Sequence, residues 1–591
     1  MCLRLPSPDL STPSNKTPSK IRLASADVLD EAGAVIVNAL DPFGIGKSFA
    51  KIRRAWLENP REFTEAAIKL CSGLQGLIFH SWNQTVGLER EAWVPVASED
   101  ARFTDPEWHQ YPAISMMVQL YLLYTRWLEQ TVYDTPGVSK KERRTAAFWV
   151  RQWFNAIAPS NFLLSNPVAL KKLLESGGKT VVKGIENWGD DLKAGDLQMV
   201  DSTAFKVGRN LATSPGAVVF RNELLELIQY APARARVHAL PIVIIAPWIN
   251  KYYILDLTPE KSLVRYLVNQ GFTVFVTSWK NPTAELSHIT FDDYMLKGAL
   301  AAVEAARSIT KAPRVHAVGY CIGGTVLAAL MAWLNKEYAG HRDKIPVAHW
   351  TLLASLVDFS RPGEIEAFLS EEAISAVESI MAEKGYLGGP ELASAFRMLR
   401  PNRLIWHYFV HRYLYGESLA AFDVLFWNAD HTRMPEAMHR FYLREFYLKN
   451  KLAEKNGVTL GGHPINFSLV EQPLYAVGAH EDHIAPWRGT FFTVRLVRGP
   501  VRYALSNSGH ILGIINPPVQ PSKREYWAGS AGPRVEAKAW RERQLKRNGS
   551  WWPDWVKWLS KHCGPMRAPP HLGNSSYPKL CAAPGTYVHE T

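Results

Sequence analysis

The sequence has few cysteines, five in 591 residues, at positions 2, 71, 321, 563 and 581. Their number is odd and no two of them stand in a Cys-x-x-Cys spacing, so the pattern predicts neither a disulfide framework nor a structural zinc site. We therefore expect a reducing compartment and no bound metal.

Long apolar runs are also missing. The sequence contains no stretch of about 20 apolar residues. The N-terminus is rich in Ser, Pro, Thr and Lys and lacks the continuous apolar segment of a signal peptide. We therefore expect a cytoplasmic protein without a membrane span. Residues 1–25 contain too little apolar surface to offset the entropy of ordering, and we expect a disordered tail there.

No long basic run accompanies the net charge of +12. An excess of this kind favours anionic partners, and nucleic acid, an anionic membrane and phosphorylated small molecules all fit it. The densest cluster is short, so we interpret it as a solvated loop and expect no nucleic-acid partner. It consists of Lys140, Lys141, Arg143 and Arg144. The 21 Trp, 22 Tyr and 24 Phe residues indicate extensive apolar surfaces for a partner or an apolar substrate.

Two hydrophobic patterns divide the rest of the chain. In residues 26–205 apolar residues recur at helical spacing, as in 111–124, which predicts a mainly helical N-terminal domain. In residues 206–591 short β-branched runs alternate with helical segments and predict a parallel sheet covered on both faces. Between about 361 and 465 helical and aromatic sequence interrupts this rhythm, and we expect an insertion that caps the carboxyl ends of the strands.

The segment Gly44-Ile45-Gly46-Lys47-Ser48 looks like the end of a phosphate-binding loop. That motif needs a glycine five positions before Gly46, where this sequence has Asp41. We therefore interpret the segment as a turn before a helix.

A candidate nucleophile follows the strand expected at 314–319. That run leads directly through Tyr320 into Cys321-Ile322-Gly323 and then into a good helix-forming sequence. This is the context of a nucleophile elbow, in which glycines flank the nucleophile because strand and helix pack too closely for side chains. The positive end of the helix dipole would stabilise a Cys321 thiolate, and the amide of Ile322 would point at a developing oxyanion. A buried structural cysteine in a glycine-rich turn is the alternative for this motif alone.

Two further residues fit the same chemistry. In the α/β-hydrolase fold an acid and then a histidine follow the nucleophile, each in a loop after a late strand. Asp482 follows the apolar run 474–478, and His510 follows the run 501–505. The histidine would accept the thiol proton, and the carboxylate would orient the imidazole. Each residue alone could belong to an ordinary turn, and the cluster His480-Glu481-Asp482-His483 could also be a surface loop or a metal site. Together the residues predict a triad of Cys321, Asp482 and His510.

A second oxyanion donor is expected after an early strand. The segment 246–250 follows the apolar run 242–246, so a backbone amide near Ile249 is the candidate, with a plain turn as the alternative. The fold class predicted is α/β, namely an α/β-hydrolase fold with a cap insertion, preceded by the helical N-terminal domain.

Motifs spread from about 158 to 555 resemble those of polyhydroxyalkanoate synthases, of the class I type. The matching segments include Ala158-Pro-Ser-Asn-Phe162, Val207-Gly-Arg-Asn210, Ile249-Asn-Lys-Tyr-Tyr-Ile-Leu-Asp-Leu257, Gly319-Tyr-Cys-Ile-Gly-Gly324, Phe422-Asp-Val-Leu-Phe-Trp-Asn428, Glu481-Asp-His-Ile-Ala-Pro486 and Gly549-Ser-Trp-Trp-Pro-Asp-Trp555. No single motif is specific, but the set is.

The resemblance assigns the family's nucleophile, acid and base to Cys321, Asp482 and His510, and it matches Trp427 in the cap to a tryptophan known in the family. It implies polymerisation of (R)-3-hydroxyacyl-CoA into polyhydroxyalkanoate through a Cys-bound thioester, with release of CoA and without a cofactor. It also implies a homodimer and association with polyester granules. The alternatives are a thioesterase or polyester depolymerase with the same triad, and a granule or scaffold protein without activity.

Some positions depart from the family pattern. Arg403 stands where an acid is expected, and His411 and Arg412 replace a more usual acidic or amide pair. Trp248 stands where some members have a smaller residue. Because of these changes, the resemblance does not fix the preferred size of the substrate or the contacts that the cap or a dimer would make.

Overall fold

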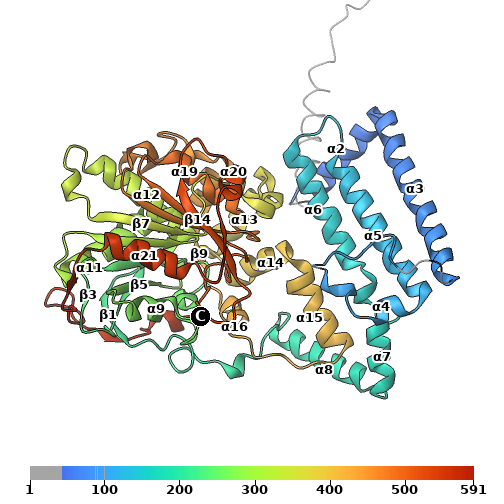
Figure 1. Ribbon diagram of the computed structural model, residues 1–591, viewed down its shortest axis with the longest axis horizontal. Helices are drawn as coiled ribbons and strands as arrows, with labels where there is room; N and C mark the ends of the chain where they lie inside the picture. The colour runs from blue at the N-terminus through green and yellow to red at the C-terminus, as the bar shows by residue number, and fades with distance from the viewer. Residues whose placement is uncertain (1–40, 42, 87, 89–90, 99) are drawn as a thin grey trace, which may run out of the picture.

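The computed structural model describes residues 41, 43–86, 88, 91–98 and 100–591, so the tail expected at 1–25 lies outside the described residues. Two parts stand side by side (Figure 1): a group of N-terminal helices, and a large sheet with helices on its faces. Helices α14 (Gly389–Leu399) and α15 (His407–Phe409) lie between the two parts. No described helix is both long enough and apolar enough to cross a membrane.

The N-terminal part consists of helices joined by loops. Its helices are α2 (Ile45–Glu58), α3 (Pro60–Thr85), α4 (Glu107–Gln110), α5 (Pro112–Tyr133), α6 (Lys140–Ala156), α7 (Pro167–Glu175) and α8 (Lys179–Ala194). Apolar side chains at helical spacing on α5, such as Val118 and Leu122, pack with Phe103 and Trp108 into a small core. The prediction of a mainly helical N-terminal region is confirmed.

The basic cluster at 140–144 is not a solvated loop, so that interpretation was wrong. It forms the first turn of α6, where Ser139 and Glu142 make a reciprocal capping box. The Lys141 ammonium also donates to the carbonyl oxygen of Leu369 at 2.7 Å. The overlooked sequence signal is the Ser-x-x-Glu spacing of Ser139 and Glu142, which is typical of a helix N-terminus even in a basic segment.

Helix α2 begins directly after Gly44, as expected for a turn before a helix. The Asp41 carboxylate accepts the backbone amides of Ile45 at 2.6 Å and of Gly46 at 2.7 Å. A side-chain carboxylate therefore occupies the place at the helix N-terminus where a phosphate would bind.

The central sheet has eleven strands in the order β15-β14-β13-β12-β7-β6-β4-β5-β2-β1-β17. The strands β4, β5, β6, β7, β12 and β13 are parallel to their neighbours within this group, and the strands at both edges are antiparallel. The parallel strands are β4 (Ile242–Ile245), β5 (Val274–Trp279), β6 (Val315–Tyr320), β7 (Val347–Leu353), β12 (Leu474–Ala479) and β13 (Val501–Ser506). The edge strands are β1 (Gly216–Arg221), β2 (Leu225–Tyr230), β14 (Glu525–Ala531), β15 (Lys546–Asn548) and β17 (Cys581–Ala582).

Each face of the sheet has its own core because successive side chains of a strand point to opposite faces. Val243 and Ile245 of β4 pack with α11 (Ala301–Thr310) and α12 (Ile322–Glu337). Ile242 and Ile244 pack on the other face with α9 (Leu263–Asn269) and α21 (Trp552–His562). This burial on both faces explains the continuous apolar runs, and the predicted fold class is confirmed.

A long insertion separates β7 from β12 and occupies residues 354–473. It contains α13 (Glu371–Lys384), α14, the helical run from η9 (Asn402–Trp406) through α15 to η10 (Val410–Leu414), α16 (Asp423–Ala429), α17 (Glu436–Phe441) and η11 (Tyr442–Leu448). It meets the loop after β4 through several contacts: Trp427 Nε1 donates to the Lys251 carbonyl oxygen at 2.6 Å, and the Lys251 ammonium pairs with Asp430 at 2.7 Å. The insertion begins at the carboxyl end of β7, on the sheet edge where the candidate site residues lie, and returns to the amino end of the parallel strand β12.

The last segment of the chain returns to the far edge of the sheet. β17 pairs antiparallel with β1, with Cys581 opposite Val218. The Glu226 carboxylate, which is buried, accepts the backbone amide of Thr586 at 2.8 Å. Further on, Glu590 pairs with Lys280 at 3.2 Å, so the segment spans the sheet edge from β1 to the loop after β5.

Candidate active site

Cys321 sits at the turn between β6 and α12. Its backbone adopts φ 53° and ψ −125°, a conformation that residues with a side chain rarely adopt and that costs about 1 to 3 kcal/mol. The Cys321 amide donates to the carbonyl oxygen of Leu353 on the neighbouring strand at 2.9 Å. The turn thus lifts the cysteine side chain out of the sheet at the carboxyl end of β6.

The flanking glycines are required by close packing. A Cβ atom added at Gly323 would lie 2.3 Å from the carbonyl oxygen of Ile245, and one at Gly319 would lie 2.3 Å from the Cα of Gly324. No side chain fits at either distance, so the sequence between the strand and the helix must have glycine at these positions.

Asp482 and His510 come together in the loops after β12 and β13. His510 Nδ1 donates to Asp482 Oδ2 at 2.7 Å, and both side chains are buried. The second carboxylate oxygen, Oδ1, accepts the backbone amides of Ile484 at 2.9 Å and Ala485 at 2.8 Å. These amides hold the carboxylate so that one oxygen faces the imidazole.

The surroundings of His510 make its imidazole a better proton acceptor. Burial opposes protonation, but the Asp482 carboxylate and then Cys321 outweigh it and raise the pKa of His510 well above its ordinary value. A side-chain hydrogen bond between His510 and Cys321 contributes to this shift. The structure therefore brings the three residues predicted from the sequence together in the order sulfur, imidazole, carboxylate.

Aromatic residues fix the loop that carries His510. The Tyr320 ring stacks on the His510 ring with centroids 5.7 Å apart, and its hydroxyl donates to the His510 carbonyl oxygen at 3.3 Å. Trp551 Nε1 donates to the Gly513 carbonyl oxygen at 2.8 Å, and Trp552 Nε1 donates to that of Ile514 at 2.9 Å. The Trp-rich motif near residue 550 thus positions the loop after the histidine.

The two amides predicted as oxyanion donors lie on neighbouring elements. Ile322 is the first residue of α12, where the initial backbone amides have no partner within the helix. Ile249 lies in the bend after β4, and the contact of Gly323 with the end of β4 brings that loop to the start of α12. Their role as donors to an oxyanion stays a prediction.

Two tyrosines near the sulfur were not singled out from the sequence. Tyr442 and Tyr447 belong to η11 of the insertion, and their rings pack 5.2 Å apart. Burial first, and then the neighbouring Cys321, raise the pKa of Tyr447; burial, Tyr447 and Cys321 raise that of Tyr442. Both phenols therefore stay neutral beside the sulfur. In the sequence Phe441-Tyr-Leu-Arg-Glu-Phe-Tyr447 they look like an ordinary amphipathic helix.

His483, directly after Asp482, was also missed as a site residue. Burial, followed by the nearby Arg400, lowers its pKa to about 4. The Arg400 guanidinium donates to the carbonyl oxygen of Glu481 at 3.4 Å. The insertion therefore touches the loop that carries the acid.

The positions that depart from the family pattern are distributed over the insertion and its base. His411 Nδ1 pairs with Glu417 at 2.7 Å, and Arg412 pairs with Asp191 of α8. Arg403 lies close enough to His483 to contribute to the lowering of its pKa. Trp248 is buried, with its ring centroid 4.4 Å from that of Tyr294.

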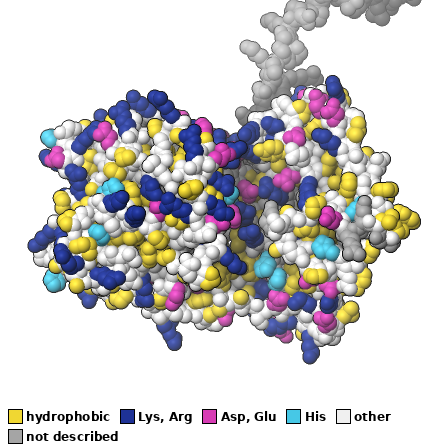
Figure 2. All heavy atoms as spheres, viewed as in Figure 1, with side chains coloured by type: hydrophobic (Ala, Val, Ile, Leu, Met, Phe, Trp, Pro, Cys, Tyr) yellow, Lys and Arg dark blue, Asp and Glu magenta, His cyan; other side chains and the backbone are white. Residues whose placement is uncertain are grey.

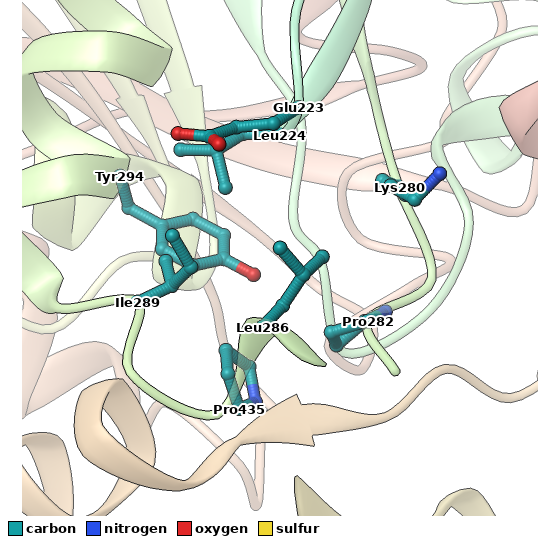
Figure 3. Close-up of a pocket in the computed structure, with 8 residues that line it drawn as sticks. All are labelled: Glu223, Leu224, Lys280, Pro282, Leu286, Ile289, Tyr294 and Pro435. Carbon is teal, nitrogen blue, oxygen red and sulfur yellow. The ribbon is translucent and has the colours of Figure 1, made fainter. Parts of the chain in front are cut away.

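A narrow pocket lies at the base of the insertion, beside this aromatic cluster (Figure 3). Tyr294, Leu286 and Pro435 line it together with Glu223, Leu224, Lys280, Pro282 and Ile289, and the Tyr294 hydroxyl points into it. None of the triad residues lines this pocket. It marks the place where strand β9 (Met434–Pro435) rests on the loop after β5, and we do not assign the reaction to it.

The strand order, the elbow after β6, and an acid and a histidine after the two following parallel strands define an α/β-hydrolase type of enzyme. Comparison with known proteins specifies the family. The family model described as "Poly-beta-hydroxybutyrate polymerase (PhaC) N-terminus" matches residues 99–267.

The chain is 40% identical over 562 residues to the poly(3-hydroxyalkanoate) polymerase of Methylorubrum extorquens, covering 94% of this chain and 91% of that protein. It is 39% identical over 513 residues to the poly(3-hydroxyalkanoate) polymerase subunit PhaC of Cupriavidus necator, covering 86% and 85%. A solved monoacylglycerol lipase from Paleococcus ferrophilus is similar over 57% of this chain and 99% of its own, at 11% identity and a TM-score of 0.32. The chain belongs to the poly(3-hydroxyalkanoate) polymerase family.

Proposed function

We propose that the protein polymerises (R)-3-hydroxyacyl-CoA into polyhydroxyalkanoate, with Cys321 carrying the growing acyl chain as a thioester and with release of CoA. The observation that carries the proposal is the meeting of Cys321, His510 and Asp482 in a chain of this family. The substrate is already activated as a thioester, so the proposed reaction needs no metal or organic cofactor.

In the first step the Cys321 sulfur attacks the thioester carbonyl of the substrate while His510 accepts the thiol proton. The C–S bond to CoA breaks, and His510 returns the proton to the departing CoA sulfur. Asp482 keeps the proton on His510 Nδ1, which leaves Nε2 free to accept another. The amides of Ile322 and Ile249 are the proposed donors to the oxyanion that forms on the carbonyl.

In the second step the 3-hydroxyl oxygen of another acyl group attacks the Cys321 thioester, and His510 accepts the hydroxyl proton and gives it to the sulfur. An oxygen ester forms and the thiol is regenerated. Exchange between two thioesters is nearly balanced in free energy, whereas formation of an ester from a thioester is downhill, so sulfur suits the intermediate. Water would compete for the same thioester, and the buried Tyr442 and half-buried Tyr447 of the insertion support a site from which it is excluded.

Exposed apolar side chains on the N-terminal helices support binding of the enzyme to the surface of the insoluble polymer in the cytoplasm. Figure 2 shows hydrophobic side chains on this part of the surface. On α8, Val182, Ile185 and Leu192 are each at least 60% exposed. Exposed apolar side chains at helical spacing fit a polyester surface. An Ile185→Lys/Leu192→Lys variant should sediment less with polymer granules than the unchanged chain, and equal sedimentation would contradict this part of the proposal.

The reaction is tested by incubating the purified protein with 3-hydroxybutyryl-CoA and its longer homologues while thiol release and polymer are measured together. The proposal expects both products, and neither from a Cys321→Ala variant. Thiol and free hydroxy acid without polymer would identify a thioesterase instead, and full activity of Cys321→Ala would refute the role of the sulfur. Light scattering of the same preparation tests the homodimer, which we also propose.

A further inference from the structure

The N-terminal helices rest on the insertion. Ion pairs join α2, α6, α7 and α8 to residues 364–417 of the insertion. They are Lys47–Glu372, Arg144–Glu366, Arg151–Glu364, Lys172–Glu417 and Asp191–Arg412. The N-terminal part is therefore in a position to act on the insertion directly.

One of these contacts differs from the others in burial. The side chains of Arg412 and Asp191 are 6% and 5% exposed, whereas the lysine or arginine of each other pair named above is at least 36% exposed. A further pair, Asp196–Arg397, has a buried arginine, but its carboxylate is 48% exposed. Exposed pairs contribute little, but a buried pair that loses one partner leaves an uncompensated charge. The Asp191–Arg412 pair is therefore the contact most able to hold the two parts together.

The geometry of this pair is fully satisfied. Arg412 donates from Nη2 to Asp191 Oδ1 at 2.7 Å and from Nε to Oδ2 at 3.2 Å, and the Tyr413 hydroxyl donates to the same Oδ2 at 2.7 Å. Asn187 donates from Nδ2 to the Arg412 carbonyl oxygen at 3.0 Å. A Cβ atom at Gly184 would lie 2.0 Å from the Tyr413 carbonyl oxygen, so α8 touches the backbone of η10. Such a contact fixes the orientation of η10 as well as its distance.

The other end of the same helical run reaches the candidate active site. Residues 402–414 form one continuous helical run, with π-helical geometry in η9 and η10. Arg400, two residues before it, donates to the carbonyl oxygen of Glu481, the neighbour of Asp482. Figure 1 shows α15, the middle of this run, between α8 and the rest of the insertion. The run thus connects α8 to the loop that carries the acid.

We propose that Asp191 and Arg412 are positioning residues: through this pair the N-terminal helices set the place of residues 402–414 beside the loop that carries Asp482 and so control access to Cys321. The inference rests on the proposed function for its substrate, but not for its access test. Neither residue touches the reacting atoms, so loss of the pair changes how substrate and water reach the sulfur and leaves the triad intact.

The test uses the full chain with Asp191→Asn and Arg412→Lys, and with Asp190→Asn as the matched control. Asp190 lies next to Asp191 on α8, but its pair with Lys193 is exposed, at 64% and 81%. The first readout is the rate at which iodoacetamide alkylates Cys321, which requires no substrate. The second is the split between KM and kcat for 3-hydroxybutyryl-CoA, together with the fraction of acyl groups released as free acid.

We expect Asp191→Asn and Arg412→Lys to raise the alkylation rate and KM by on the order of tenfold, the effect of about 1.4 kcal/mol. The free-acid fraction should rise and kcat should change little, while Asp190→Asn should match the unchanged chain. In a double-mutant cycle the two substitutions should be non-additive, because either one breaks the pair. If a single variant is insoluble, the Asp191→Asn/Arg412→Gln chain, which removes both charges, takes its place with the same expectation.

Folded variants with unchanged alkylation, KM and free-acid fraction would overturn the proposal, as would additive effects in the cycle. A fall in kcat alone would do the same, since it would show an effect on chemistry. If the unchanged chain releases no thiol from any hydroxyacyl-CoA, the proposed function fails, yet the alkylation rates still decide whether the pair controls access.

Discussion

The hydrogen bond between Asp482 and His510 offers the sharpest test of the candidate site. In an Asp482→Asn variant, the single amide oxygen would stay with the backbone amides of Ile484 and Ala485, which hold Oδ1 at 2.9 and 2.8 Å. The amide nitrogen would then face His510 Nδ1 across the present 2.7 Å. Two N–H groups cannot face each other at that distance. The imidazole would therefore carry its proton on Nε2, and this nitrogen could no longer accept a proton from Cys321.

The size of the effect follows from the burial of the pair. The side chains of His510 and Asp482 are 8% and 0% exposed, so solvent cannot replace the lost bond. Loss of the correct tautomer in such a triad lowers the rate on the order of 10³ to 10⁴-fold, or about 4 to 5.5 kcal/mol of transition-state stabilisation. The variant also loses the largest influence that raises the pKa of His510, so this pKa should fall.

The assay is thiol release from saturating 3-hydroxybutyryl-CoA, with the pH dependence of Cys321 alkylation as a second reading. A Glu481→Gln variant is the control, since this adjacent carboxylate is exposed. Asp482→Asn should lose activity and show alkylation displaced to higher pH, and Glu481→Gln should show neither. Activity of Asp482→Asn within tenfold of the unchanged chain would refute the role assigned to the carboxylate.

Three further results are expected. Gly323→Ala forces the start of α12 away from the carbonyl oxygen of Ile245, and a displacement of about 1 Å should slow thiol release about 10²-fold; unchanged kinetics would contradict the packing argument. Trp427→Phe removes the donor to the buried Lys251 carbonyl and should lower the free energy of unfolding in urea by about 1 to 3 kcal/mol. Burial lowers the pKa of His349 to about 4, so the unfolded chain binds its proton first and stability should fall by up to about 3 kcal/mol as pH drops from 6.5 to 4; His349→Gln should lose this part of the pH dependence in unfolding measured at both pH values.

The sequence predicted the central strands and the residues at their ends because these depend on short, local patterns. Apolar runs at 242–246 and 501–505 are the strands β4 and β13 to within one residue. The glycines beside Cys321 are likewise a local pattern, because the close packing of strand and helix leaves no room for a side chain there. Asp482 and His510 could be found because each directly follows such a run.

What the sequence could not predict depends on contacts between distant segments. Nothing around Asp191 shows that it meets Arg412, 221 residues later in the chain. An arginine that departs from a family pattern looks like added surface charge until its buried partner is known. The pairing of residues 581–582 with the edge of the sheet could not be predicted either, because a strand of two residues has no periodic pattern.

The backbone at Cys321 has a consequence for engineering. A glycine at this position would adopt φ 53° without the penalty that a side chain suffers, so the chain would fold more firmly and have no nucleophile. A screen of variants for thermostability alone would therefore favour Cys321→Gly, which has no nucleophile. A selection for a more stable enzyme therefore has to include an activity assay in every round, so that variants without Cys321 are discarded.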